Sequence, residues 1–270
     1  MNDFWIALEQ HIGTVTGQPF AIRQRHPVGG GCIHEAWRVR DRDREYFVKC
    51  NETTSLPMFE AEAAGLAELA TTATVWVPRP LGHDVVAGRA CLVLEYLPLG
   101  GSHEGAMERL GRQLAALHRQ PQACFGWQRD NFIGSTPQPN PRGADWIEFW
   151  RESRLGFQLE LAAAHGYGGA WLRRGEALRA RLDGLFVGYR PSPALLHGDL
   201  WSGNVGCTVA GEPVVFDPAV YFGDREADLA MTELFGGFSD RFYAAYREAL
   251  PLADGYPQRR TLYNLYHVLN

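Results

Sequence analysis

The chain has 270 residues, a formal net charge of −5 and a pI near 6.0, with 46% hydrophobic and 21% charged residues. This is the composition of a globular protein with room for one large or two modest domains, and it does not favour disorder. The acidic balance argues against nucleic acid as the main partner, because binding to a phosphate backbone needs a basic face.

Membrane, zinc and disulfide-rich classes are also disfavoured. The N-terminal stretch MNDFWIALEQ lacks the basic start and apolar core of a signal peptide, and no stretch approaches the roughly 20 apolar residues that span a bilayer. The five cysteines form no C-x-x-C pair and have no histidine at metal-ligand spacing. We therefore expect a cytoplasmic protein without a membrane partner, a zinc site or a disulfide framework.

The N-terminal part predicts a helix followed by strands. Phe4, Leu8 and Ile12 share one face of an opening amphipathic helix, and residues 20–50 then change to short β-prone runs separated by glycine-rich and polar turns. This pattern predicts a three-stranded meander whose third strand carries Lys49. Lys49 is the single lysine of the chain, against 25 arginines. Coding bias explains the missing lysines but not this one, which suggests a position where a compact cation works and a planar guanidinium does not.

The next segment, residues 56–70, predicts a helix with a carboxylate on its apolar face. Phe59, Glu62 and Leu66 recur at spacings of three and four, which places Glu62 on the inward side. Glu60 lies about 160° away at about 100° per residue, so Glu62 is the better candidate for a buried partner. The alternative is that both glutamates are solvated helix formers.

Two further strands, within residues 77–84 and 89–97, complete the β-rich part. Pro98 and a glycine pair end the second run and predict a boundary near residues 97–101. The expected domains are an N-lobe of residues 1–97 and a C-lobe of residues 98–270.

The C-terminal part predicts mainly helices. An apolar stripe from Met107 to Leu117 indicates one helix, and residues 145–164 and 170–187 indicate two more. Residues 121–143 are too rich in proline and glycine for regular structure, and a loop of this length with aromatic residues favours a functional role. The aromatic residues expected to pack in the interior are Trp127, Phe132, Trp146, Phe149 and Trp150.

The densest chemical signal lies in LLHGDLWSGN, residues 195–204, and in PVVFDPA, which starts at residue 213. Phosphoryl transfer to an alcohol needs a base near the hydroxyl, ligands for Mg²⁺ and a cation on the nucleotide phosphates. His197, Asp199 and Asn204 have the H-x-D-x-x-x-x-N spacing of a kinase catalytic loop. An aspartate at the end of the following apolar strand stands where the metal-binding aspartate should be.

These motifs resemble the fructosamine kinase, or ketosamine-3-kinase, family of the protein-kinase-like superfamily. The likeness runs from residue 4 to 270 and is carried by HGDLWSGN together with residues 125–140, 145–162 and 216–238. Aminoglycoside phosphotransferases and choline kinases share the HGD loop, whereas DPA and the run GDREADLAMTELFGGF point to the ketosamine branch. The resemblance implies an α+β bilobal fold, with a five-stranded antiparallel N-lobe sheet and one helix above a mainly helical C-lobe.

The resemblance also implies roles for the central residues. Lys49 would contact the α- and β-phosphates of ATP and pair with Glu62. Asp199 would orient the substrate hydroxyl and accept its proton, and Asn204 and Asp217 would hold Mg²⁺.

Supporting and binding roles follow in the same way. His197 would support the catalytic loop rather than perform acid–base chemistry, and a buried Asp228 would accept hydrogen bonds from the loop backbone. The other implied contacts are Gly29, Gly30 and Gly31 on the phosphates, Glu95 to Leu97 at the adenine, Trp201 and Asp224 on the sugar and its amine, and Cys32 in a redox link between two chains.

Three functional hypotheses stay open. The first is an ATP- and Mg²⁺-dependent kinase of the 3-hydroxyl of ketosamines, whose 3-phosphate product eliminates and frees the amine, so that glycation is reversed. The second is a kinase of another small alcohol or an aminoglycoside, and the third is a catalytically inactive nucleotide-binding or redox module. Cys32 is equally compatible with a small residue in a tight loop, so the chain is expected to be a monomer or a redox-linked homodimer.

Overall fold

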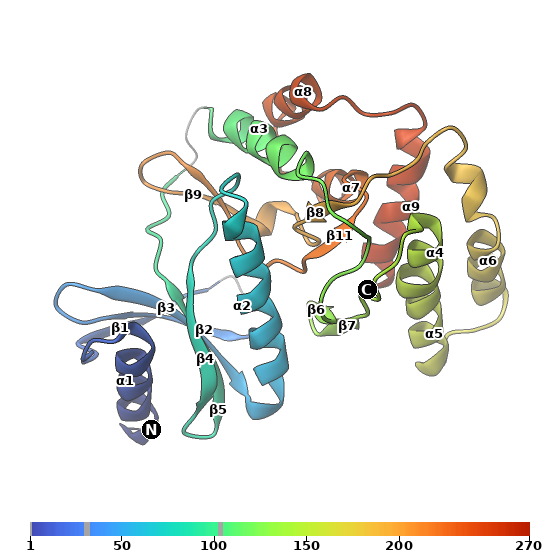
Figure 1. Ribbon diagram of the computed structural model, residues 1–270. Coiled ribbons are helices and arrows are strands. Elements are labelled where there is room, and N and C mark those ends of the chain that lie inside the picture. Colours follow the sequence, from blue (N-terminus) through green and yellow to red (C-terminus); the bar gives the residue numbers. More distant parts are fainter. Residues whose placement is uncertain (1, 30–32, 102–104) are drawn as a thin grey trace.

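The computed structural model describes residues 2–29, 33–101 and 105–270. Within these ranges the chain forms a sheet-containing N-lobe and a mainly helical C-lobe, as Figure 1 shows. The predicted α+β class is confirmed. The N-lobe elements are α1 (Asn2–Thr16), β1 (Gln24–Pro27), β2 (Glu35–Arg40), β3 (Glu45–Glu52), η1 (Thr53–Ser55), α2 (Leu56–Thr71), β4 (Pro80–Val86) and β5 (Arg89–Glu95).

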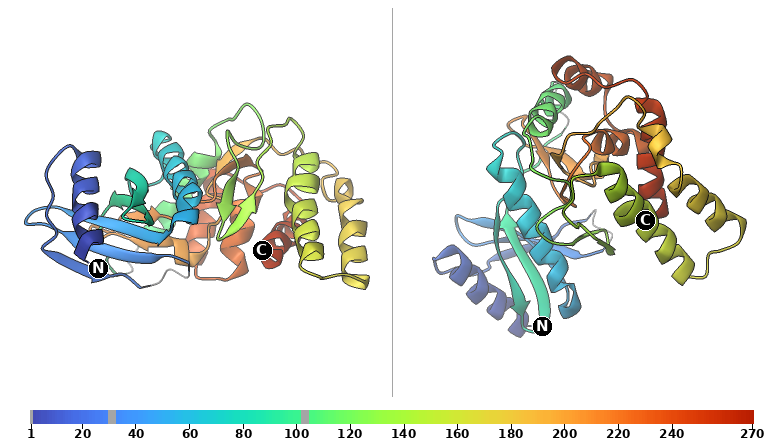
Figure 2. Two further views of the ribbon diagram at one scale, coloured as in Figure 1. Left: turned by 90° about the horizontal axis from the view of Figure 1, so that it is seen from below. Right: turned by 45° about the vertical axis from the view of Figure 1, so that its right-hand side comes forward.

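The N-lobe sheet has the strand order β1-β2-β3-β5-β4, and every neighbouring pair is antiparallel. Side chains alternate between its two faces, as the period of two in a strand requires. Val48 and Cys50 on β3 pack with Leu8 and Ile12 of α1 in a separate small core. Lys49 therefore points to the other face. Among the described residues the N-lobe therefore has two α-helices, α1 and α2, where one was expected. Figures 1 and 2 show these helices on either side of β4 and β5.

Cysteines meet across the middle of this sheet. Cys50 on β3 pairs with Cys91 on β5, and their Sγ atoms lie 3.6 Å apart without a bond. Cys124 and Cys207 are also free thiols. The four cysteines of the described ranges are therefore free thiols.

The C-lobe packs its helices in pairs. Helix α3 lies against α8, and α7 lies against α9, while α4 to α6 form the end farthest from the N-lobe (Figure 2). The elements are α3 (Ala106–His118), β6 (Asn131–Ile133), β7 (Thr136–Gln138), α4 (Trp146–Trp150), η2 (Arg151–Gly156), α5 (Phe157–Ala164), α6 (Ala170–Arg179), η3 (Leu182–Leu185), β8 (Ala194–Leu196), η4 (Ser202–Asn204), β9 (Val205–Cys207), β10 (Pro213–Val215), β11 (Tyr221–Gly223), α7 (Glu226–Leu234), α8 (Asp240–Ala249) and α9 (Tyr256–Leu269).

The predicted helix over residues 145–164 is present, with the π-helical segment η2 between α4 and α5. The helix predicted over residues 170–187 is shorter, because α6 ends at Arg179 and a 3₁₀ turn follows. The interior positions expected for Trp127, Trp146, Phe149 and Trp150 are confirmed. No helix in the described ranges is both long and apolar enough to cross a bilayer.

The prediction that residues 121–143 lack regular structure is wrong for their centre, where β6 and β7 form a hairpin. Buried side-chain amides make this possible: Asn131 Oδ1 accepts hydrogen bonds from Gln138 and Asn140 at 2.8 and 2.7 Å. Asn131 Nδ2 donates to the carbonyl of Val220 at 2.8 Å. These bonds satisfy polar groups that a loop would otherwise leave unpaired, and they attach the hairpin to the backbone that follows the expected metal ligand.

Candidate active site

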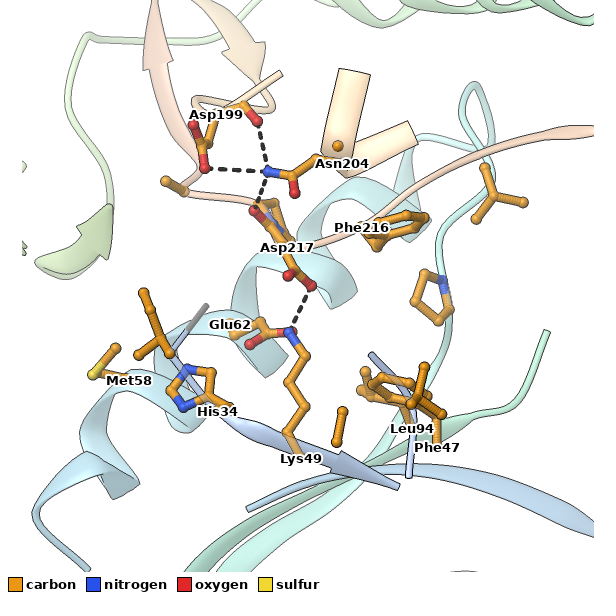
Figure 3. A pocket seen from close by; sticks show the side chains of 18 of the residues that line it. His34, Phe47, Lys49, Met58, Glu62, Leu94, Asp199, Asn204, Phe216 and Asp217 are labelled. Atoms are coloured by element: carbon orange, nitrogen blue, oxygen red, sulfur yellow. Dashed lines mark hydrogen bonds and ion pairs between the residues drawn. The ribbon is translucent and has the colours of Figure 1, made fainter. Parts of the chain in front are cut away.

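A cleft of about 580 Å³ lies between the two lobes. It is lined by β-strands of the N-lobe, by α2, by the β6–β7 hairpin and by the loops around β9 and β10. Figure 3 shows that side chains from distant parts of the sequence point toward one another inside it. The sequence-predicted residues that meet there are Lys49, Glu62, Asp199, Asn204 and Asp217.

Lys49 lies between two carboxylates. Its Nζ is 2.7 Å from Glu62 Oε1 and 2.6 Å from Asp217 Oδ1, and the residue is 6% exposed. Burial opposes the charge, but the two carboxylates outweigh it and raise the pKa of Lys49. The ammonium is therefore charged and held by α2 on one side and by the loop after β10 on the other. A guanidinium is larger and directs its donors in a fixed plane, which explains why a lysine is kept here.

Asp199 is the carboxylate that the expected catalytic loop, residues 197–204, brings to the cleft. Asn204 Nδ2 donates to its backbone oxygen at 2.9 Å and to its Oδ2 at 3.1 Å. Burial raises the pKa of the Asp199 carboxyl to about 7. A carboxylate with a pKa near neutrality is suited to take a proton from a hydroxyl group and to release it again.

Asp217 follows β10 and Phe216 with a backbone that few non-glycine residues adopt. Its φ is +57°, in the left-handed region, and its side chain is 46% exposed to the cleft. Such backbone conformations are costly and gather at functional sites. This backbone conformation places the Asp217 carboxylate opposite Lys49 and beside Asn204.

Asn204 and Asp217 together offer oxygen ligands for a hard cation. The amide nitrogen of Asn204 is occupied by Asp199 and, at 3.5 Å, by the carbonyl of Asp217. Its Oδ1 has no hydrogen-bond partner among the described residues and is the free end of the amide. Amide and carboxylate oxygens are the ligands that Mg²⁺ takes, usually with phosphate oxygens and waters completing the shell. Within residues 2–29, 33–101 and 105–270 no group of three or more His, Cys, Asp or Glu side chains could hold a metal ion. The donor set therefore fits a shared, open Mg²⁺ site rather than a closed protein cage.

Asp228 accepts hydrogen bonds from the backbone at the start of the expected catalytic loop. Its two carboxylate oxygens accept the backbone N–H groups of His197 and Gly198, each at 2.8 Å, and His118 Nε2 lies 3.2 Å away. Despite burial, the hydrogen bond from His118 and the loop amides holds the pKa of Asp228 below its usual value. The Asp228 carboxylate thus fixes the loop backbone from the N-terminal half of α7.

His197 joins the catalytic loop to the segment that carries Asp217. Its Nε2 donates to the carbonyl of Phe216 at 3.0 Å, and its Nδ1 accepts the N–H of Asp199 at 3.3 Å. Burial lowers the pKa of His197, so the ring is neutral. With both nitrogens occupied by backbone groups, His197 lies where a supporting residue is expected.

The other expected residues divide into three groups. Gly29, Glu95 and Leu97 line the cleft, although Gly29 does not adopt a left-handed φ. Trp201 also lines it and remains 37% exposed, with its ring 6.1 Å from that of Phe235. Gly30, Gly31 and Cys32 lie outside the described residues.

Asp224 does not lie in the cleft, where it was expected to contact the substrate. It is buried, does not line the cleft, and accepts hydrogen bonds from the hydroxyls of Tyr189 at 2.8 Å and Tyr263 at 2.6 Å. Two tyrosine hydroxyls and the N–H of Glu226 occupy its oxygens. Its role as a sugar or amine contact is therefore not supported.

Sequence reasoning missed cleft residues on both lobes. His34, three residues after the glycine run, lines the cleft near Lys49, and Phe132 lines it from the β6–β7 hairpin rather than packing in the interior. A polar residue at the entry of β2 was the available signal for His34. For Phe132 the available signal was the aromatic content of residues 121–143, although its side chain was expected to pack in the interior.

Comparisons with known proteins agree with this geometry. A model of the fructosamine kinase family matches residues 4–270. The chain belongs to the fructosamine kinase family. It is 48% identical to a Synechocystis sp. protein named "Probable ketoamine kinase", over 98% of this chain and 90% of that protein. It is 42% identical to the chloroplastic protein-ribulosamine 3-kinase of Arabidopsis thaliana, over 94% of this chain and 78% of that protein.

Comparison with solved structures confirms the fold of this chain. A Haemophilus somnus protein assigned as a fructosamine-3-kinase superposes with a TM-score of 0.90 at 31% identity, covering 100% of this chain and 90% of that one. A choline kinase of Streptococcus pneumoniae, at 14% identity and a TM-score of 0.64, covers 97% of this chain and 86% of the other and shows the shared fold alone. The predicted protein-kinase-like fold is therefore confirmed.

Proposed function

We propose that this protein is an ATP- and Mg²⁺-dependent kinase that phosphorylates the 3-hydroxyl of ketosamines, the adducts of reducing sugars with amines. The observation that carries the proposal is the meeting of Lys49, Asp199, Asn204 and Asp217 in one cleft. Phosphoryl transfer depends on positioning and charge stabilisation, which is what this set of residues offers. Membership of the fructosamine kinase family, and relatives named ketoamine and ribulosamine kinases, support the ketosamine as the acceptor.

The residues of the chain divide the work as follows. Lys49, fixed by Glu62, holds the α- and β-phosphates of ATP. Asn204 and Asp217 hold Mg²⁺, which when bound neutralises charge on the phosphates. Asp199 orients the sugar hydroxyl and takes its proton at a carboxylate oxygen while the sugar oxygen bonds to the γ-phosphorus and the bond from that phosphorus to ADP breaks.

The product of this reaction accounts for a repair role. A ketosamine 3-phosphate eliminates inorganic phosphate, and water then hydrolyses the bond between the sugar carbon and the nitrogen, which releases the amine and a dicarbonyl sugar fragment. Free amines or protein lysines are regenerated, so the protein acts in deglycation.

The test is ATP consumption with Mg²⁺, measured side by side with a ribulosamine, a fructosamine and an aminoglycoside as acceptors. The Asp199→Asn variant is the blank, since it keeps the shape of the side chain and removes its charge. Turnover of a ketosamine alone is the expected result. Turnover of the aminoglycoside alone would replace the proposed acceptor, and turnover of none of the three would contradict it.

A further inference from the structure

His34 is a cleft residue to which the proposed mechanism gives no task. Its ring lines the cleft, and Figure 3 shows it between Met58 and the side chain of Lys49. It packs on the buried Phe59 of α2 with ring centroids 4.7 Å apart. The ring is thus held on the N-lobe wall at the end of the cleft where Lys49 meets Asp217.

The side chain of Asn51 on β3 determines which ring nitrogen of His34 carries the proton. Its Oδ1 accepts the N–H of Glu52 at 2.7 Å, and its Nδ2 donates to the carbonyl of Ile33 at 3.1 Å. These two backbone partners fix the orientation of the amide. The same Nδ2 lies 2.8 Å from His34 Nδ1, and because an amide nitrogen only donates, Nδ1 accepts. The neutral ring therefore carries its proton on Nε2.

The charged groups around His34 keep the ring neutral. Burial and then the Lys49 ammonium lower the pKa of His34 to about 4, against an opposing effect of the Asp217 carboxylate. Glu62 of α2 also faces this end of the cleft but is paired with Lys49. Among the described residues, no hydrogen-bond partner of His34 Nε2 is present. The ring that lines the cleft beside the buried ammonium thus carries an N–H donor with no partner among the described residues.

We propose that His34 donates its Nε2–H to a phosphate oxygen of the bound nucleotide, and that Asn51 positions it for this. The inference rests on the proposed use of a nucleotide. A phosphate is the ligand that fits, because it accepts hydrogen bonds only and is attracted by the neighbouring Lys49. A neutral donor adds a bond to the anion without repelling the ammonium. His34 is then a nucleotide-binding residue, and Asn51 is a positioning residue.

Calorimetric binding of ADP and of adenosine, both in buffer with Mg²⁺, tests the contact without turnover. We expect His34→Leu to weaken ADP binding about tenfold, as the loss of a hydrogen bond to a charged group predicts, and to leave adenosine binding unchanged. His34→Gln is the matched control, since its amide nitrogen replaces Nε2 and should restore most of the affinity for ADP. Unchanged ADP affinity in His34→Leu, or an equal loss for adenosine, would overturn the proposal.

A nitrogen NMR spectrum of ¹⁵N-histidine-labelled protein tests the role of Asn51. The signal that disappears in His34→Gln should show a proton on Nε2 in the wild type and a mixture of both tautomers in Asn51→Leu. Asn51→Leu should also weaken ADP more than adenosine. A His34 ring with its proton on Nδ1 in the wild type would contradict the assignment, and a wild type that binds neither ligand would refute nucleotide use itself.

Discussion

Asn204 donates through one amide nitrogen to both the backbone carbonyl and the carboxylate of Asp199, at 2.9 and 3.1 Å. The bond to the carboxylate orients the group that takes the substrate proton in the proposed mechanism, and the bond to the carbonyl holds the loop in place. The oxygen of the same amide is left for a cation. One side chain therefore connects the proposed base to the proposed metal site.

Replacing Asn204 by alanine should affect both functions at once. We expect kcat to fall about 100-fold, a loss typical of removing a group that positions a reacting carboxylate, and the Mg²⁺ concentration for half-maximal activity to rise. Titrating Mg²⁺ at saturating ATP and ketosamine measures both. Ser202→Ala, in the same 3₁₀ turn, is the control and should resemble the wild type; a normal Mg²⁺ requirement in Asn204→Ala would speak against Asn204 as a ligand.

The two glutamates at the start of α2 offer a matched pair of substitutions. Glu62→Gln removes one of the two carboxylates on Lys49, and we expect kcat/KM to fall 10- to 100-fold, about 1.4–2.7 kcal/mol of transition-state stabilisation. Glu60→Gln should change little, because Glu60 forms only a 3.4 Å ion pair with Arg129 and is 38% exposed. Steady-state kinetics of both variants measure the two values of kcat/KM. Equal losses of kcat/KM in Glu62→Gln and Glu60→Gln would contradict the assignment of Glu62 as the residue that positions Lys49.

The meeting of the proposed catalytic residues in one cleft was predictable from sequence because short segments hold them. Asp199 and Asn204 lie within one loop, and Asp217 follows a strand of three residues, so spacing alone places them together. Glu62 was identifiable from the helical period of α2. These predictions depend on local geometry that few residues determine.

Other features depend on contacts between distant parts of the chain. Asp224 was expected at the substrate, but it binds Tyr189, 35 residues earlier in the sequence, and Tyr263, 39 residues later. The β6–β7 hairpin similarly depends on an amide network that reaches Val220. No pattern within a single segment indicates such partners, and tertiary packing decides the outcome.

Asp224 and Trp201 should therefore respond in opposite ways. Asp224→Ala removes the carboxylate that accepts hydrogen bonds from the hydroxyls of the half-buried Tyr189 and the buried Tyr263, and we expect it to lower the free energy of unfolding by about 2–4 kcal/mol without changing KM for the sugar acceptor. Trp201→Ala should leave the melting temperature nearly unchanged, because the side chain is exposed, and raise the acceptor KM about tenfold. Thermal unfolding and acceptor titrations of the two variants measure both effects. A normal melting temperature with a raised KM in Asp224→Ala would restore its role at the substrate.

The pKa of Asp199 predicts that this carboxylate destabilises the metal-free protein at neutral pH. Folding raises the pKa from the ordinary value of 3.8 to about 7. Between these values the folded state keeps a proton that the unfolded chain releases, so the stability of the folded state falls as the pH rises from about 4 to about 7. Asp199→Asn cannot ionise and escapes this loss.

We therefore expect Asp199→Asn, in buffer with EDTA, to be more stable than the wild type at pH 8 and to lose that advantage toward pH 4. Each pKa unit corresponds to about 1.4 kcal/mol, so the difference at pH 8 should be on the order of 1–4 kcal/mol. Urea unfolding across the pH range measures it. Asp254→Asn, at an exposed position, is the matched control and should follow the wild type at every pH. A difference between Asp199→Asn and the wild type that does not change with pH would mean that the carboxyl ionises at its ordinary pKa in the folded protein, and that burial does not prepare it as a base.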